Sequence, residues 1–410
     1  MQPKPKAVRL TDAELFDWLR LIRSENVGPR TFRALIANCG SAGAAIKALP
    51  HLARRGGGAR PIRIATSQEI EQELDAARKI GARFLGLDEP DYPPALRQID
   101  SAPPILALRG RAEALQQPAV AIVGSRNASA AGLTFADRLA RGIGGAGYVI
   151  VSGLARGVDQ RAHIASLETG TIAVLAGGHA KPYPPEAAPL IARIAEAGAI
   201  ISEMPVEWEP RGRDFPRRNR LVSGLALGTV IVEAARGSGS LITARFAAEQ
   251  NREVFAVPGS PLDPRAEGTN DLLRDGANIC ARPEDVLSVL EPVRARDPFS
   301  ILREGRFAPD EPLWGEPRFA GLAPASAGRA EAGELQPGSL DLVARDAPHA
   351  MRARILGLLG PSPISIDELV RAAEAPISDV RIVLLELDLA GRLEHSGGAR
   401  VALTVAQGRD

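Results

Sequence analysis

Short apolar stretches recur between residues 119 and 257, and this pattern constrains the fold more than any other feature of the chain. The stretches lie at 119–123, 148–151, 171–175, 199–201, 229–232 and 253–257. Each interval between them holds a helical stretch or a long loop. Strands that alternate with helices in this way form a parallel sheet with helices on both faces. We therefore expect an α/β fold with an extended Rossmann-like, doubly wound parallel sheet.

The first two apolar stretches each end in a turn of small residues that carries one arginine. In a parallel sheet such turns lie at the carboxyl edge, where ligands bind. Backbone N–H groups at the following helix N-termini favour an anion there, and an arginine adds a bidentate phosphate contact. The residues that we expect to hold phosphate here are Gly124, Ser125, Arg126, Gly153, Arg156 and Gly157.

Composition sets wide limits on the function. A chain of 410 residues has room for two or three domains, and its net charge of +1 does not indicate a nucleic-acid binder, so any attraction must come from local clusters. Cys39 and Cys280 are the only cysteines and have no metal-ligand spacing, which argues against a zinc site or a disulfide framework. The sequence shows no membrane-spanning run and no signal-like segment. We expect a cytoplasmic protein with no metal and no cofactor.

Small helical modules are predicted on both sides of the α/β domain at 86–290. Residues 8–85 contain two helices joined by the turn Asn26–Arg30 and resemble helix-hairpin-helix and sterile-alpha-motif-like modules; an ordinary helical hairpin is the alternative. Residues 291–347 lose all periodicity and are expected to be a largely disordered linker.

The last segment, 348–406, predicts three helices followed by a β-hairpin around Ser396–Gly398, with Ser365 and Glu368 as a capping box. This order is typical of a winged helix, and a generic helical cap is the alternative. The third helix carries more acid (Asp379, Glu386 and Asp388) than base. A contact with protein is therefore at least as well supported as a contact with DNA.

An ordered series of motifs runs through the α/β segment. It consists of Ser152–Asp159 (SGLARGVD), Thr171–Leu175, Tyr183-Pro184, Ser202–Pro205, Phe215–Arg220 (FPRRNR), Glu233-Ala234, Ser238–Ala244, Val257–Gly259 and Gly268–Asn270. The series resembles the DNA-processing protein A (DprA/Smf) family, closely over about residues 105–290 and more weakly at the two ends. Each motif alone is weak, and their order is specific.

The resemblance implies a recombination mediator that binds and protects incoming single-stranded DNA during natural transformation of competent cells. Members of the family help to load the RecA recombinase onto that DNA. They act as dimers through the Rossmann-like domain and use no catalytic chemistry.

Further phosphate and base contacts are expected along the same sheet edge. Lys181 and Tyr183 form a cation beside a ring, suited to a phosphate and its base, and the family places a lysine and an aromatic residue here; Tyr183 covering the sheet edge is the alternative. Five arginines lie between 211 and 220, and Asn219 and Arg220 are expected to face the phosphate pocket. The other expected contacts are Arg217, Arg218, Ser238, Gly239, Ser240 and Thr243.

Two residues beside these turns have a structural and a catalytic interpretation. Asp159 begins the second helix, where it can cap the helix and orient Arg156. His163, one turn later, is expected to pack against the loop, because a single helical histidine is weak support for acid–base chemistry.

An enzyme of the nucleotide phosphoribohydrolase type is the alternative function. Glu203 or Glu233 would then be the acid that attacks a ribose. Against this, the Pro-Gly-Gly-x-Gly-Thr signature of such enzymes is replaced by Ala234–Ser240, and the first strand–helix turn has neither a P-loop nor a GxGxxG motif. A third possibility is a regulator that binds a small nucleotide at this edge and DNA through the winged module.

A homodimer is expected from the resemblance and from the apolar content of the later helices. The side chains concerned are Leu241, Ile242, Phe246, Ala247, Leu272 and Leu273. They offer more apolar surface than one sheet face covers, and a twofold interface is one outlet for it. The alternative is that they pack on their own sheet.

Overall fold

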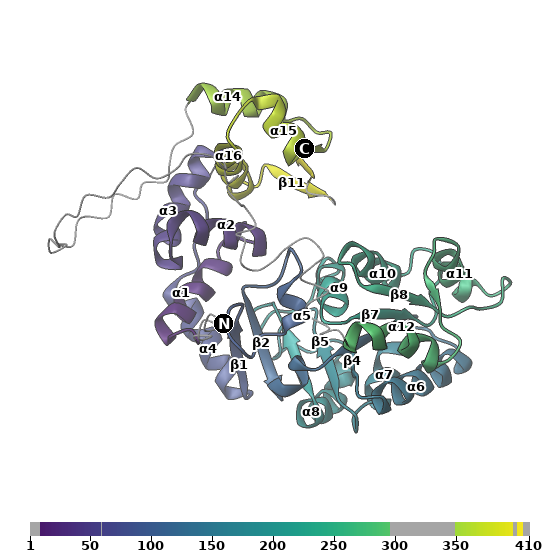
Figure 1. Cartoon of the computed structure of the whole chain (residues 1–410). Helices are drawn as coiled ribbons and strands as arrows, with labels where there is room; N and C mark the ends of the chain where they lie inside the picture. The colour runs from purple at the N-terminus through teal and green to yellow at the C-terminus, as the bar shows by residue number, and fades with distance from the viewer. Residues whose placement is uncertain (1–8, 59, 296–348, 397–399, 405–410) are drawn as a thin grey trace, which may run out of the picture.

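A nine-stranded sheet forms the centre of the computed structural model, which describes residues 9–58, 60–295, 349–396 and 400–404 (Figure 1). The strand order is β1-β2-β6-β5-β4-β3-β7-β8-β9. The strands are β1 (Ala82–Gly86), β2 (Ile105–Gly110), β3 (Ala119–Val123), β4 (Val149–Ser152), β5 (Thr171–Val174), β6 (Ala199–Ser202), β7 (Gly228–Ile231), β8 (Glu253–Ala256) and β9 (Asn278–Ile279). Strands β3 to β9 pair in parallel, so the predicted doubly wound sheet is confirmed.

Two strands at one side of the sheet were not predicted. β1 pairs antiparallel with β2, and β2 pairs antiparallel with β6. The sheet is therefore mixed, with an antiparallel pair added beyond the parallel strands.

Helices cover both faces of the sheet and bury its strands. They are α5 (Pro94–Arg97), α6 (Ala130–Gly145), α7 (Val158–Ala165), α8 (Ala188–Ala197), α9 (Asp214–Gly224), α10 (Gly239–Glu249), α11 (Glu267–Arg274) and α12 (Pro283–Ala295), with 3-10 turns at Ala112–Gln116, Pro185–Ala187 and Pro264–Ala266. All five residues of β3 are buried, as a continuous apolar run requires when both faces are covered.

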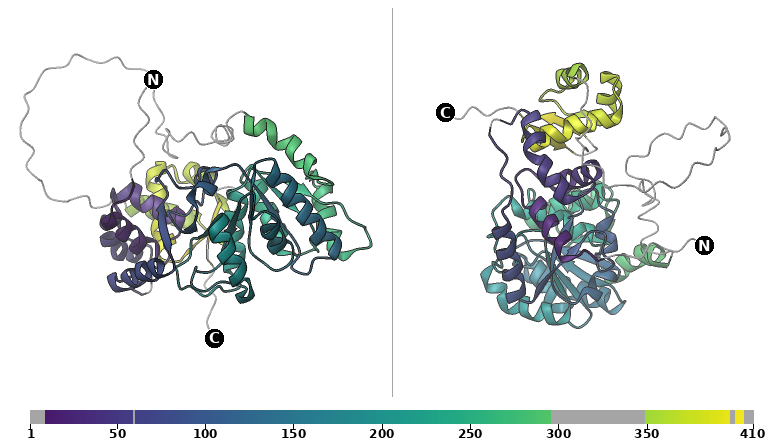
Figure 2. Two further views of the ribbon diagram at one scale, coloured as in Figure 1. Left: turned by 90° about the horizontal axis from the view of Figure 1, so that it is seen from below. Right: turned by 90° about the vertical axis from the view of Figure 1, so that its left-hand side faces the viewer.

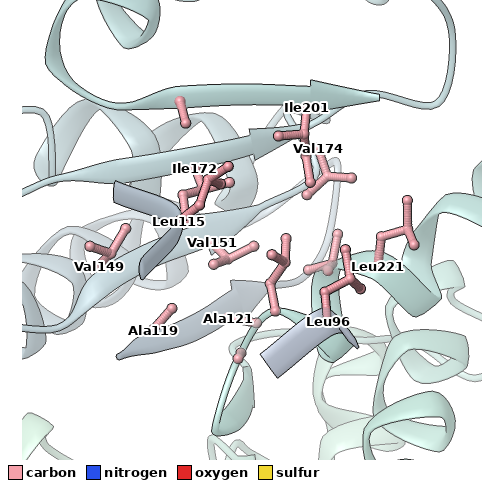
Figure 3. Close-up of a cluster of buried hydrophobic side chains, with 14 of the residues drawn as sticks. Leu96, Leu115, Ala119, Ala121, Val149, Val151, Ile172, Val174, Ile201 and Leu221 are labelled. Atoms are coloured by element: carbon pink, nitrogen blue, oxygen red, sulfur yellow. The ribbon is translucent and has the colours of Figure 1, made fainter. Parts of the chain in front are cut away.

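The side chains of each strand divide between two apolar cores. Ala121 and Val151 point to the face with Leu96 of α5 and Leu221 of α9 (Figure 3). Ile122 and its neighbours on the other face pack on α6, α7 and α12. Both faces of the sheet are therefore covered by apolar packing, and the polar turns lie beyond the strand ends.

The N-terminal module consists of α1 (Asp12–Ile22), α2 (Pro29–Cys39), α3 (Ala42–Arg55) and α4 (Ser67–Lys79). Thr11 and Glu14 form a capping box at the start of α1. A tight turn at Asn26–Gly28 joins α1 to α2, at the position that the sequence predicts, and Pro29 and Arg30 of the predicted turn belong to α2. Arg23 connects this module to the sheet: it pairs with Glu73 at 2.8 Å and donates to the backbone oxygen of Glu203 at 2.9 Å.

The C-terminal module is a winged helix, which confirms the prediction. It comprises α14 (His349–Leu358), β10 (Ile364–Ser365), α15 (Ile366–Ala373), α16 (Ile377–Leu389), β11 (Leu393–Ser396) and β12 (Arg400–Leu403), with strand order β10-β12-β11. The predicted capping box of Ser365 and Glu368 is present. The module lies beside the N-terminal helices (Figures 1 and 2).

Parts of two predictions fall outside the described residues. Most of the predicted linker 291–347 lies there, although α12 continues past its predicted start to Ala295. The glycines of the predicted turn at Ser396–Gly398 lie there as well. Within the described ranges, every helix is too short or too polar to cross a lipid bilayer.

Candidate functional site

The first two predicted turns follow β3 and β4, at the carboxyl edge of the parallel strands. The chain order changes direction at β3, because β4, β5 and β6 extend to one side of it and β7, β8 and β9 to the other. This position is a topological switch point, where open α/β sheets bind ligands.

Glycines allow the two turns to touch. Gly157 has a φ of +83°, and a Cβ atom on it would lie 2.3 Å from the backbone oxygen of Ser125. The same oxygen accepts a hydrogen bond from the Val158 N–H at 3.3 Å. Gly124 lies against Val158, where a Cβ atom would meet the valine Cγ2 at 2.8 Å. The turns after β3 and β4 therefore form one packed unit.

Asp159 holds the second turn from inside. One carboxylate oxygen, Oδ2, accepts hydrogen bonds from the N–H groups of Gly153 at 3.1 Å and Ala155 at 3.4 Å. Burial raises the pKa of Asp159, and the nearby Arg218 guanidinium works against that rise. These contacts give Asp159 a structural task in the loop backbone.

The packed turns form one wall of a small depression. Its lining comprises Arg126, Gly153, Ala155, Arg156, Tyr183, Pro184 and Phe215. The structure thus brings together predicted residues from the loops after β3, β4 and β5. Lys181 is exposed on the same loop as Tyr183.

Two aromatic rings and an arginine are in contact within this depression, and the two rings meet edge to face. The rings of Tyr183 and Phe215 lie 5.3 Å apart between centroids at an interplanar angle of 71°. The Arg126 guanidinium carbon lies 5.3 Å from the Phe215 ring centroid. Tyr183 is 47% exposed, so its ring is open to a ligand. This arrangement suits a base stacked on a ring beside a phosphate held by a cation.

Phe215 was not singled out from the sequence as a site residue. It stands within the run of five arginines at 211–220, in a chain with only 4% aromatic residues. A ring next to concentrated positive charge is the signal that would have identified it.

Two cations of the depression, Arg126 and Arg156, and the nearby Lys181 have no carboxylate partner among the described residues. Arg126, Arg156 and Lys181 are exposed, and none has an acidic partner within 4.0 Å in the described part of the chain. Arg217 is different, because its Nε lies 3.1 Å from a Glu203 carboxylate oxygen. The positive charge of the first three is therefore available to an anion.

Arg218 and Arg220 are buried, and their guanidinium groups make contacts inside the protein. Arg218 donates to the carbonyl oxygens of Gly153 and Val174, and its burial lowers its pKa to about 10. Arg220 pairs with Glu203 and donates to the Ser101 oxygen, so the prediction that it faces the phosphate pocket is corrected. The cause is the packing of α9, which lies between the sheet, α5 and α10.

The predicted residues at the start of α10 form their own hydrogen bonds. Ser238 caps the helix, and its hydroxyl lies 2.8 Å from that of Ser240. Ser240 and Thr243 are buried, whereas Gly239 is exposed and accepts a hydrogen bond from the Asn219 side chain at 3.1 Å. Asn219 thus connects α9 to α10, and it does not line the depression.

The acidic and imidazole groups that an enzyme would use are bound in structural contacts. Glu233 accepts hydrogen bonds from the Ser129 N–H at 2.9 Å and the Ser129 hydroxyl at 2.5 Å. Glu203 pairs with two arginines. His163 is fully buried with its Nδ1 2.7 Å from the Thr171 hydroxyl, and burial lowers its pKa to about 3. Among the described residues, no cluster of His, Cys, Asp and Glu could hold a metal ion.

Family comparisons match all three parts of the chain. Residues 83–291 match the model of DNA recombination-mediator protein A. Residues 12–76 match the DprA-like N-terminal HHH domain, and residues 343–399 match the DprA winged helix domain. The matches follow the three modules of the fold.

Two relatives and one solved structure extend this similarity. Protein Smf of Escherichia coli is 34% identical over 339 residues, covering 82% of this chain and 81% of the relative. Protein Smf of Synechocystis is 32% identical over 335 residues, covering 80% and 82%. The X-ray structure of DNA processing protein A from Streptococcus pneumoniae has a TM-score of 0.57 at 31% identity, covering 68% of this chain and 98% of that one.

Proposed function

The chain belongs to the DNA recombination-mediator protein A (DprA/Smf) family, and from this premise we propose that it binds and protects single-stranded DNA at the carboxyl edge of its sheet. The observation that carries the proposal is the depression with unpaired Arg126 and Arg156 beside the rings of Tyr183 and Phe215. A cation and a ring side by side accept a phosphate and the base attached to it.

The shape of the site favours a single strand over a duplex. The bases of a duplex are stacked on each other, so they cannot reach rings between loops at a sheet edge. A single strand can turn one base toward Tyr183 and leave its phosphates near Arg126 and Arg156. Backbone contacts of this kind read no base sequence, so we expect weak sequence preference.

The proposal includes a place in recombination. As in the family that the chain belongs to, the bound strand would be passed to RecA, in natural transformation or in another recombination route. This role implies a cytoplasmic location. It needs no catalytic chemistry, which agrees with the engagement of Glu203 and Glu233 in internal contacts.

The proposal also includes a homodimer formed through the sheet domain. Leu262 is 93% exposed and Ile279, on edge strand β9, is 57% exposed. Of the six predicted side chains, Ile242, Phe246 and Leu273 are partly exposed on α10 and α11, which lie at one end of the sheet domain (Figure 1). Ala247 is buried, and Leu241 and Leu272 pack against the core of their own sheet. Exposed apolar side chains gathered at one end support a contact with a second copy.

Binding curves with labelled oligonucleotides of one sequence, single-stranded and duplex, test the proposal. Single-strand binding should be tighter and should weaken steeply with added salt, because neutralised phosphates release counterions. Equal affinity for the two forms would contradict it. Incubation with nucleoside monophosphates completes the test, since release of free base would support the phosphoribohydrolase alternative.

A further inference from the structure

Helix α16 of the winged helix is buried on two opposite sides. Val383 and Leu387 pack in the core of the winged helix itself. Leu385 and Leu389 belong to the apolar core of the N-terminal module, together with Phe32. A helix that is apolar all round is an interior helix, and here its interior is shared between two modules.

A buried carboxylate joins the two modules at this contact. Glu386 of α16 is fully buried, and one of its oxygens lies 2.9 Å from the Arg55 Nε at the end of α3. Arg352 of α14 pairs with the other oxygen and donates to the Arg55 carbonyl. Breaking such a pair leaves an uncompensated charge in the interior, so the pair selects one docked arrangement.

Three further hydrogen bonds surround the contact. The Thr31 hydroxyl donates to an Asp388 carboxylate oxygen at 2.5 Å, and the Asn26 side chain donates to the Leu389 carbonyl at 3.0 Å. Arg392 donates to the Gly56 carbonyl at 3.2 Å. Asn26 belongs to the α1–α2 turn, so the winged helix covers that turn.

The charges of α16 are unsuited to DNA. A winged or helix-turn-helix module reads DNA by placing an exposed helix of this position in the major groove. α16 carries three acidic residues, Asp379, Glu386 and Asp388, against one arginine, Arg381. The acidic side chains of this helix would repel DNA phosphates. If the helix left the N-terminal module, its apolar side chains would also be exposed to water, which costs free energy.

We propose that α16 is a docking helix, which binds the N-terminal module of the same chain through Glu386 and does not read duplex DNA. The winged helix is then fixed over the α1–α2 turn in the intact protein. The inference concerns a surface away from the sheet edge and goes beyond the proposed single-strand binding.

A disulfide placed across the contact tests the proposal in the full-length chain. Thr31→Cys combined with Asp388→Cys should form an intramolecular crosslink under mild oxidation, seen as a monomer of altered mobility that reductant reverses. Each single substitution serves as a control for reaction with Cys39 or Cys280. Adding Glu386→Gln to the two cysteine substitutions should lower the rate of crosslinking at least about tenfold, because the buried ion pair is lost. Glu394→Gln, a change of an exposed residue in the same module, should leave the rate unchanged.

The other outcomes would overturn the proposal. A crosslink between two chains would show that the surface holds a second copy, and no crosslink in a folded double variant would show that the modules do not dock. A gain of duplex binding by Glu386→Gln would make α16 a masked DNA reader. Crosslinking is measured in the absence of DNA, so its result does not depend on single-strand binding. A protein that forms the crosslink but does not bind single-stranded DNA would refute the proposed function and support the docking proposal.

Discussion

At the residue scale, Arg126 combines two properties that distinguish it from most other arginines of the chain. Its guanidinium lies over the Phe215 ring, and no carboxylate within the described residues neutralises it. Arg211 has a similar ring contact, 4.8 Å from the centroid of Trp208, but it lies outside the lining of the depression. Substitutions of Arg126 and of Arg211 therefore remove the same charge at two positions, and only the first position lies in the depression.

Arg126→Ala should weaken single-strand binding by about 1.5–3 kcal/mol, because a charge-assisted contact at a preorganised site is lost. Arg211→Ala should cost about 1 kcal/mol or less, as an exposed charge does. Fluorescence anisotropy with a labelled oligonucleotide measures both. Equal losses in two folded variants would mean that the basic surface as a whole binds DNA and that the depression is misplaced.

His163 makes the stability of the fold depend on pH. Its pKa falls from 6.5 to about 3 on folding, because burial disfavours the charged ring. Between these values the unfolded chain binds a proton that the folded chain excludes. The contribution of the neutral His163 ring to the free energy of unfolding is therefore fully present above about pH 6.5. As the pH drops below this value, the free energy of unfolding should decrease by up to about 1.4 kcal/mol per pH unit.

Chemical denaturation of His163→Asn between pH 7.5 and 5 measures this effect. The variant should lose part of the pH slope, and the remainder should come from His179, whose pKa is lowered to about 4 by burial. His51→Asn, at an exposed position, is the control and should keep the full slope. An unchanged slope in His163→Asn would contradict the buried, neutral state of the ring.

At the element scale, the turn after β4 depends on Gly157. Gly157→Ala adds a methyl group 2.3 Å from the Ser125 oxygen at a φ of +83°, so the two turns must separate. Gly237→Ala is the matched control, because Gly237 has a φ of +76° with no atom within 4 Å. The control should cost about 1 kcal/mol of stability from backbone strain alone.

Gly157→Ala should cost more than the control, by about 1–3 kcal/mol, and should also weaken single-strand binding. Thermal unfolding and the binding assay provide the two readouts. If the two variants lose equal stability, the contact between the turns is not a constraint on the site.

Elements that obey a local pattern were predictable from the sequence, and elements fixed by distant partners were not. β3 to β8 lie in apolar runs because helices cover both faces of the sheet. β1 and β2 lie outside the strand–helix alternation, and their antiparallel pairing depends on contacts across the fold. Both loop arginines, Arg126 and Arg156, were placed at the depression because the turn after a buried strand has a fixed position.

The arginines of α9 show the limit of the same reasoning. Arg217 is exposed, whereas Arg218 and Arg220 are buried, although the sequence presents them as one basic run. The direction of each depends on what packs around α9. The sequence marks Phe215 only as a ring within a basic run, and the fold brings it beside Arg126 and Tyr183.

At the scale of the whole molecule, the proposed dimer predicts the mass in solution. Light scattering at micromolar protein should give twice the chain mass, with or without a short oligonucleotide. Leu262→Asp combined with Ile279→Asp should shift the mass toward the monomer, because charged groups are costly in an apolar interface. Two sites on a dimer should also bind a long strand more tightly than a short one.

A strictly monomeric protein that still prefers long strands would leave the two-site model without support. Leu358→Asp, at a partly exposed position on α14 of the winged helix, is the matched control and should not change the mass.

The proposed dimer contact has a consequence for the size of the assembly, and it lies at one side of the sheet. β1 and β2 lie beside the N-terminal module, whereas β9, a strand of two residues, ends the sheet at the other side. A contact about a twofold axis uses the same surface on both copies, so a dimer through Leu262 and Ile279 would occupy that surface on each chain. Assembly through this surface would therefore stop at two chains and would not extend into a continuous filament.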